Sequence, residues 1–171
     1  MNAIATLNKP SPVDAFVGEV LPPDRRQSLF SGMPAHIKPA VFERNLVNAI
    51  MANTNLMKYD ARLVYREVSK AAGLGLLLDP QLGEAYIIEA YNYKTRNVEP
   101  LLRVGYRGLT KLARQSGEVE QVYAHEVYSG DPIKCTLGVE KSLVHEPALF
   151  TDRGVIVGYY AVVKYKGGDF D

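Results

Sequence analysis

The stretch from Pro100 to Gly117, PLLRVGYRGLTKLARQSG, constrains the fold more than any other part of the sequence. A helix turns by about 100° per residue, so a helix over 105–116 places four apolar residues on one side: Tyr106, Leu109, Leu112 and Ala113. Three basic residues fall together on the opposite side: Arg107, Lys111 and Arg114. Gly117 is a natural helix stop. We therefore expect a two-faced helix whose apolar side docks on a sheet.

The basic side of this helix has no acidic residue within the helix to pair with. Gly105 and Gly108, near the helix start, permit close backbone approach, and a helix N-terminus favours phosphate. Residues 91–117, here called the basic window, hold six basic residues and only Glu99 as an acid, a net of +5 in a chain whose total is +1. A concentration of this kind favours a nucleic-acid partner over an ordinary solvated helix face, which is the alternative reading.

The rest of the composition is that of a globular protein. Its 171 residues fit one domain, with 47% hydrophobic and 23% charged residues. There is no apolar run long enough for a membrane span and no signal-peptide pattern at the N-terminus, and Cys135 is the only cysteine, which fits the cytoplasm. Prolines among small residues predict a flexible N-terminal arm over 1–23, so we expect a single core domain over 24–171.

The expected elements follow an α+β plan. Helices are predicted from Asp24 to about Phe30, over 39–53, and over 60–73 with Asp60 as cap and Gly73 as stop. Strands are predicted over 84–93, 98–104, 119–128, 133–137, 142–145 and 155–166. The predicted fold is therefore N-terminal helices followed by a mainly antiparallel sheet, with the one basic helix packed on it.

Residues that could carry catalysis do not fall into a working pattern. Asp79, Glu84 and Glu89 precede Lys94 in the manner of a metal-dependent nuclease, but the lysine is not two residues after the second acid, where such sites place it. His125 and His145 each precede a glutamate that points to the opposite face of a strand, so structural or surface roles are favoured. There is no P-loop. We predict no catalytic residue, metal or cofactor, and no enzyme; the nuclease remains the alternative.

Tyrosines accompany the basic residues. The chain has eleven tyrosines and no tryptophan, and Tyr91, Tyr93 and Tyr106 lie within the basic window. Aromatic rings beside cations suit base stacking on single strands. Packing within a sheet is the alternative for each ring.

Five blocks of the sequence resemble the RecT family of phage recombinases, which are single-strand DNA annealing proteins. The blocks are GLGLLLDPQLGEAYIIEAYN, RVGYRGLTKLARQSG, YAHEVYSGD, HEPA and RGVIVGYYAVVKYKGG, and they cover about 70–168. Arg103 stands where the family pattern has glutamine. Family chains continue past the position of residue 171, so we expect the family's C-terminal part to be absent here.

The resemblance implies a β-β-β-α core and ATP-independent annealing of complementary strands in homologous recombination and DNA repair. It also implies homo-oligomers, as rings or helical filaments, that hold single-stranded DNA and annealed duplex. A 5′→3′ exonuclease is the implied partner, with a host single-strand-binding protein as a further candidate; no membrane is involved. A passive single-strand-binding protein without annealing activity is a second alternative.

We predict nine DNA-binding residues, most of them on the basic helix and the strands before it. Phosphate contacts by these side chains would make binding largely independent of sequence. The residues are Lys94, Arg96, Arg103, Tyr106, Arg107, Lys111 and Arg114, with Lys164 and Lys166 on one face of the last strand.

Overall fold

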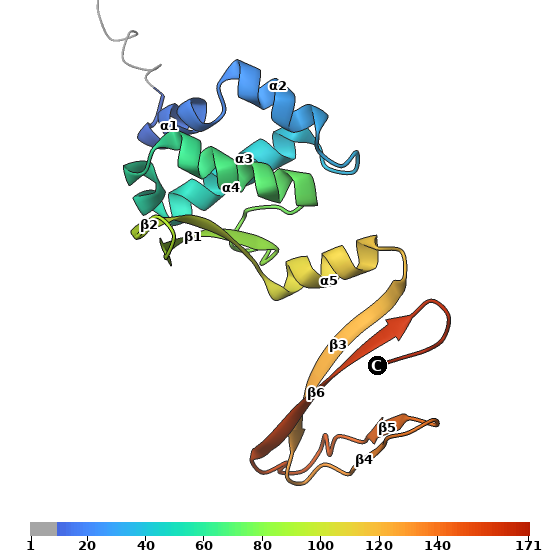
Figure 1. Cartoon of the computed structure of the whole chain (residues 1–171). Coiled ribbons are helices and arrows are strands. Elements are labelled where there is room, and N and C mark those ends of the chain that lie inside the picture. The colour runs from blue at the N-terminus through green and yellow to red at the C-terminus, as the bar shows by residue number, and fades with distance from the viewer. Residues whose placement is uncertain (1–9) are drawn as a thin grey trace, which may run out of the picture. The chain divides into compact units, whose positions relative to one another are not determined.

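The computed structural model describes residues 10–171, and its contacts divide the chain into two compact units. The first unit extends to Leu112, and the second begins at Ala113. The sequence, by contrast, predicted one core domain over 24–171. The division falls within helix α5 (Tyr106–Gln115). Helices precede antiparallel strand pairs along the chain, so the predicted α+β class is confirmed (Figure 1). No helix in the described part of the chain is long and apolar enough to cross a membrane.

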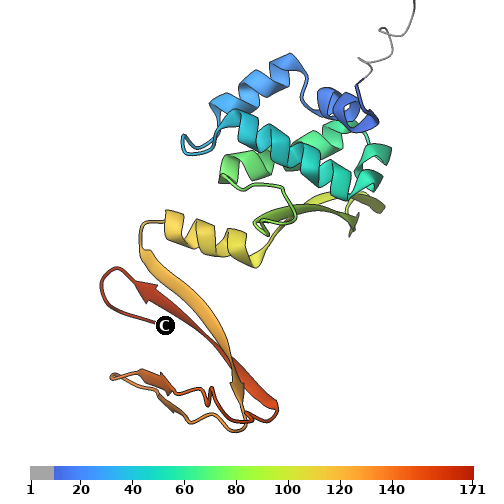
Figure 2. The ribbon, with the colours of Figure 1, turned by 180° about the vertical axis from the view of Figure 1, so that it is seen from behind.

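Helices make up most of the first unit and cover one side of a hairpin (Figures 1 and 2). They are α1 (Pro12–Val20), α2 (Pro23–Ser31), α3 (Pro39–Ala52), the short 3₁₀ helix η1 (Thr54–Lys58) and α4 (Ala61–Leu74). Their buried side chains form one apolar cluster that includes Phe42, Leu46, Ile50, Val64 and Val68. Burial of this cluster, in line with the apolar period of α3 and α4, holds the helices together.

Helix α1 corrects the prediction of a flexible arm over 1–23. Ser11 caps it by accepting a hydrogen bond from the Asp14 N–H at 3.1 Å, and Pro12 occupies its first turn. Phe16, Val17 and Val20 are buried in the core of the first unit. The prolines therefore open a packed helix instead of marking a loose segment. Residues 1–9, the remainder of the predicted arm, lie outside the described residues.

Helix α4 begins as predicted and ends later. The Asp60 side chain accepts the Arg62 N–H at 2.7 Å, which confirms the predicted cap. The predicted stop at Gly73 is wrong, because Gly73 is helical and the left-handed residue is Gly75, with φ of 68°. Two glycines lie near this helix end, and only the second takes the conformation that glycine allows at low cost.

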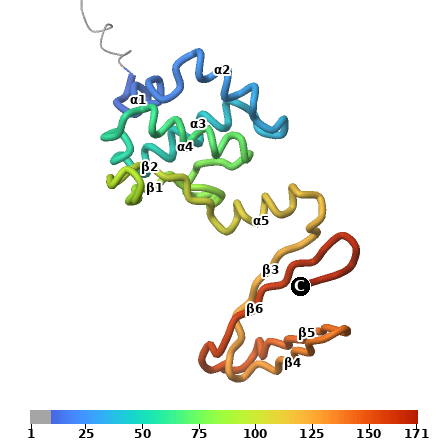
Figure 3. The backbone as a smooth tube through the Cα atoms, in the orientation of Figure 1, coloured from blue at the N-terminus to red at the C-terminus, as the bar shows by residue number. Residues whose placement is uncertain are grey.

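Strands β1 (Ala85–Asn92) and β2 (Asn97–Val104) form an antiparallel hairpin (Figure 3). The pairing starts with Ala85 opposite Val104 and ends with Asn92 opposite Asn97. Ala85 and Ile87 are buried in the helical core, and Leu102 packs against it. Because side chains alternate along a strand, one face of the hairpin is anchored on the helices. The tip of the hairpin extends past this anchored part and carries the first basic residues of the window.

The second unit contains two further antiparallel pairs. Strand β3 (Val119–Tyr128) pairs with β6 (Ile156–Tyr165), and β4 (Ile133–Thr136) pairs with β5 (Ser142–His145). The strands thus form three two-stranded sheets, where the sequence predicted one mainly antiparallel sheet. Val127 and Val162 are the buried apolar side chains of this unit among the described residues. A polar centre, described below, supplements this small core.

Candidate nucleic-acid interface

Helix α5 docks on the first unit through glycines. The Gly105 N–H donates to the Glu84 carbonyl at 2.9 Å. A Cβ added at Gly105 or Gly108 would overlap the backbone carbonyls of Gly83 and Glu84, and at Gly108 it would also lie 2.9 Å from Val104 Cγ1. The close backbone approach predicted for these two glycines is therefore confirmed, and it lets the helix lie directly on the loop before β1.

The apolar residues of α5 do not all face the docked side, which corrects the predicted orientation. Leu112 packs against the core, but Tyr106 is 72% exposed and Leu109 is 59% exposed. The docked face is made by Gly108, Lys111 and Leu112 instead. Glycine has no Cβ, so the helix axis can come closer to the backbone of the loop before β1 on the side where the glycine lies.

Lys111 belongs to this docked face and has a counter-ion. Its Nζ lies 2.7 Å from Glu84 Oε2, and both side chains are mostly buried. The same carboxylate oxygen accepts the Leu77 N–H at 2.9 Å. The prediction of a row of unpaired cations is therefore wrong at Lys111, because its partner comes from 27 residues earlier in the chain. Lys111 fastens α5 to the start of β1.

The other cations of the basic window are exposed. Arg107 donates from Nε to the Tyr106 hydroxyl at 3.0 Å, with its guanidinium 5.7 Å from the centre of that ring. Within residues 10–171, none of these side chains forms an ion pair with a carboxylate: Lys94, Arg96, Arg103, Arg107 and Arg114. Their positive charge is available to a ligand on the hairpin and on the exposed side of α5.

Arg96 stands in the hairpin turn in the left-handed conformation, with φ of 56°. Its N–H donates to the Asn92 carbonyl at 2.8 Å and closes the turn. A residue with a Cβ costs roughly 1 kcal/mol or more in this conformation, and glycine is the usual choice. The turn therefore places an exposed cation at the tip of the hairpin.

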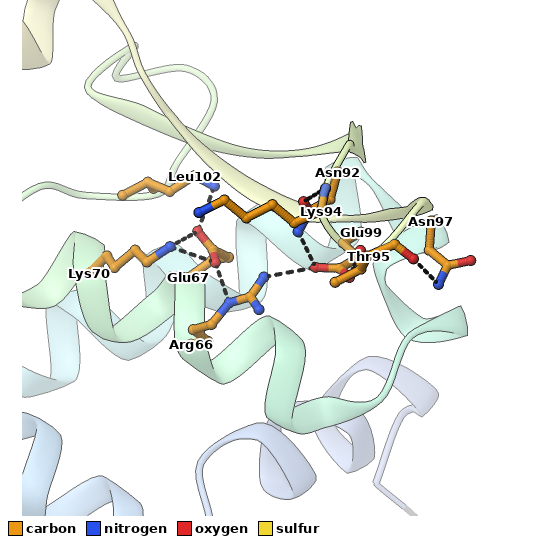
Figure 4. A network of polar contacts seen from close by, with 9 residues as sticks. All are labelled: Arg66, Glu67, Lys70, Asn92, Lys94, Thr95, Asn97, Glu99 and Leu102. Atoms are coloured by element: carbon orange, nitrogen blue, oxygen red, sulfur yellow. Dashed lines mark hydrogen bonds and ion pairs between the residues drawn. The ribbon is translucent and has the colours of Figure 1, made fainter.

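A network of ion pairs ties β2 to α4, as Figure 4 shows. Glu67 is fully buried and accepts from Lys70 Nζ at 2.8 Å, from Arg66 Nε at 2.7 Å and from the Leu102 N–H at 3.0 Å. Burial raises the pKa of Glu67, but the bonds from Lys70, the Leu102 N–H and Arg66 outweigh burial and lower it overall. Arg66 also reaches Glu99 Oε2 at 3.3 Å.

Glu67 could have been found from the sequence. It lies three residues after Val64 and four before Ala71, so it shares the buried face of α4. A glutamate on an apolar helix face indicates a paired, structural carboxylate.

Asp131 is the polar centre of the second unit. Its carboxylate has no exposed surface and accepts from Arg153 at 2.5 and 3.0 Å, from the Ala148 N–H at 3.1 Å, and from the Tyr128 N–H at 3.1 Å. Arg153 lowers the pKa of Asp131 most; burial opposes this, and the backbone donors add to the lowering. His145 lies between Asp131 and the Tyr160 hydroxyl, at 3.2 and 3.1 Å, in the structural role expected for it.

The two lysines predicted on β6 lie in the second unit. Lys164 has Glu120 Oε2 as a counter-ion at 3.1 Å, whereas the Lys166 side chain is exposed. Their role in DNA binding stays a prediction.

The three carboxylates considered for a nuclease are held by different partners. Asp79 accepts from Asn48 at 2.7 Å, and Glu89 accepts from the Tyr59 hydroxyl at 2.8 Å. Glu84 binds Lys111 and the Leu77 N–H, as described above. Within the described residues, no three His, Cys, Asp or Glu side chains gather as they do in a metal site. The carboxylate cluster that the nuclease alternative requires is not formed there.

The fold and the candidate interface together define a class of protein. Its members are α+β chains that carry a basic hairpin and a basic helix docked through glycines. The family model of the RecT family matches residues 40–171, and the chain belongs to this family. Protein RecT of Escherichia coli (strain K12) is 28% identical over 162 residues. The match covers 94% of this chain and 59% of that protein, so the chain spans less than two thirds of the length of its relative.

Proposed function

We propose that this chain binds single-stranded DNA through the exposed cations of the basic window and anneals complementary strands without ATP. The observation that carries this proposal is that five basic side chains of residues 94–114 have no carboxylate partner among residues 10–171, in a window of net charge +5. Membership of the RecT family supports the same function.

Arg107 and Arg114 on α5, together with Lys94 and Arg96 at the hairpin tip, contact phosphates of the bound strand. Contacts of this kind hold the backbone and read no base, so binding is largely independent of sequence. Partial neutralisation of both backbones lowers their repulsion, and base pairing between the strands supplies the specificity. No covalent bond is made or broken. Lys111 contributes chiefly by holding α5 in place.

Family membership supports two extensions of this proposal. The chain forms rings or helical filaments with single-stranded DNA or annealed duplex along them, and it takes strands produced by a 5′→3′ exonuclease in the presence of a host single-strand-binding protein. Both extensions concern assemblies of the whole protein.

The direct test is the salt dependence of single-strand binding by the double variant Arg107→Glu and Arg114→Glu. Each lost phosphate contact removes about 0.7 from the log–log slope of the binding constant against salt. The matched control is the double variant Arg44→Glu and Arg62→Glu, which makes the same charge change at exposed positions of α3 and α4 outside the basic window. An unchanged slope in the double variant would mean that the α5 cations only face solvent.

Pairing of complementary labelled oligonucleotides at fixed salt separates the rival functions. An annealing protein accelerates pairing without nucleotide, and the double variant loses this acceleration. A passive binding protein holds single strands without accelerating pairing. A metal-dependent nuclease shortens the labelled strand when Mg²⁺ or Mn²⁺ is added and stops with chelator.

A further inference from the structure

The tip of the β1–β2 hairpin holds a hollow whose aromatic side chains have no part in the phosphate contacts proposed above. Its volume is about 450 Å³, within the range of sites that take small organic groups. Residues of both strands and of the turn line it, together with one arginine from α4. The lining includes the side chains of Tyr91, Tyr93, Lys94 and Arg66.

Two tyrosine rings stand at this hollow in an edge-to-face arrangement. The ring centres of Tyr91 and Tyr93 are 5.1 Å apart and the ring planes lie at 83°. Tyr91 is 52% exposed and Tyr93 is 86% exposed, and neither ring belongs to the buried core. An edge-to-face pair occupies only one ring face, so the pair stiffens the tip and still leaves an aromatic face open. Little of the Tyr93 side chain is covered by the rest of the fold, so its packing role is small.

Cations flank the open ring. Lys94 directly follows Tyr93, and its side chain has no ion-pair partner among residues 10–171. Arg66 is held in place by Glu67 Oε1 at 2.7 Å and Glu99 Oε2 at 3.3 Å (Figure 4). A flat ring with one paired and one unpaired cation in the same hollow matches a nucleotide, which combines a flat base with a phosphate.

We propose that this hollow accepts one unstacked nucleobase of the bound single strand, with the base stacked on the open face of Tyr93. This inference rests on the proposed function, because it assigns a base subsite to the same DNA surface. Tyr91 packs edge-to-face with Tyr93 and supports it, and Lys94 contacts the phosphate next to the base. Every base has a π-face, so the subsite tolerates any sequence. An aromatic side chain of a partner protein fits the rings but leaves Lys94 without an anion.

The test measures the binding of two single strands of equal length to the full chain, one an oligothymidylate and the other an abasic deoxyribose-phosphate strand. Tyr93→Ala lowers the affinity for the base-bearing strand by about fivefold or more, the lower end of measured base–aromatic stacking. Tyr93→Phe keeps the ring and retains the affinity. The matched control is Tyr159→Ala on β6, which removes another largely exposed ring (76%).

The abasic strand decides between a base contact and an indirect effect. Wild type and Tyr93→Ala bind the abasic strand equally well, and the salt slope of both is the same, because the ring contacts no phosphate. An equal loss of affinity on both strands, or no loss on either, overturns the base subsite while the DNA-binding function stands. Wild type that binds neither strand overturns the proposed function itself.

Discussion

Docking of α5 through Gly108 gives a sharp prediction for the substitution Gly108→Ala. Alanine is normally the better helix residue, so this change stabilises an ordinary helix by about 0.5–1 kcal/mol. At Gly108 the new methyl group overlaps the Glu84 carbonyl and lies 2.9 Å from Val104 Cγ1. A backbone carbonyl has no rotamer to change, so α5 has to shift away from the loop before β1.

The expected cost follows from that overlap. Overpacking of a close contact costs about 1–3 kcal/mol, and the helix preference of alanine offsets part of it. We expect the free energy of unfolding of the first unit to fall by about 1–2 kcal/mol. The shift also strains the ion pair between Lys111 and Glu84, which spans the same contact.

Urea unfolding followed by far-ultraviolet circular dichroism measures this change, since the helices lie mainly in the first unit. The matched control is Gly73→Ala, an exposed helical glycine of α4 with no atom within 4 Å of the added Cβ. It should stabilise the unit by about 0.5 kcal/mol. The docking described for α5 is refuted if Gly108→Ala stabilises the unit as much as Gly73→Ala does.

Two further substitutions test the turn and the polar centre. Arg96→Gly should raise the free energy of unfolding by up to about 1 kcal/mol, because it removes a left-handed arginine, while lowering the salt slope of single-strand binding by about 0.7; an unchanged slope would show that Arg96 contacts no phosphate. The depressed pKa of Asp131 means that its stabilisation is present above its ordinary value of 3.8 and is lost as the pH falls toward its folded value. In urea unfolding at a series of pH values, Asp131→Asn should lower the stability at neutral pH and flatten its decline in acid. A parallel decline in wild type and variant would contradict this.

Local signals predicted the elements well. The period of Val41, Phe42, Leu46 and Ile50 gave α3, and the cap at Asp60 gave the start of α4. Helix α1 carried the same kind of signal, with apolar residues at 13, 16, 17 and 20 after a serine cap, but its prolines favoured a loop. Proline in the first helical turn is compatible with a helix, which is the physical reason that α1 was missed.

Long-range contacts could not be predicted in the same way. Helical period grouped Lys111 with Arg107 and Arg114, but Lys111 lies on the docked face and pairs with Glu84. Period could not show this pair, because the pair depends on where α5 docks. The docking depends in turn on Gly105 and Gly108, because only a residue without a Cβ allows the helix to lie this close to the loop before β1. The periodicity of apolar residues alone therefore predicted the wrong face of α5 as the one that packs on the core.

Glu67 closes one edge of the hairpin. By accepting the Leu102 N–H, its carboxylate occupies a backbone donor on the outer side of β2, the side along which α4 lies. The sheet contains only β1 and β2 within residues 10–171, so its other edge is that of β1. An exposed strand edge invites pairing with another chain, and a charged side chain bound to the backbone blocks it. A strand added along β2 would first have to displace this bond, so the hairpin extends more readily along β1.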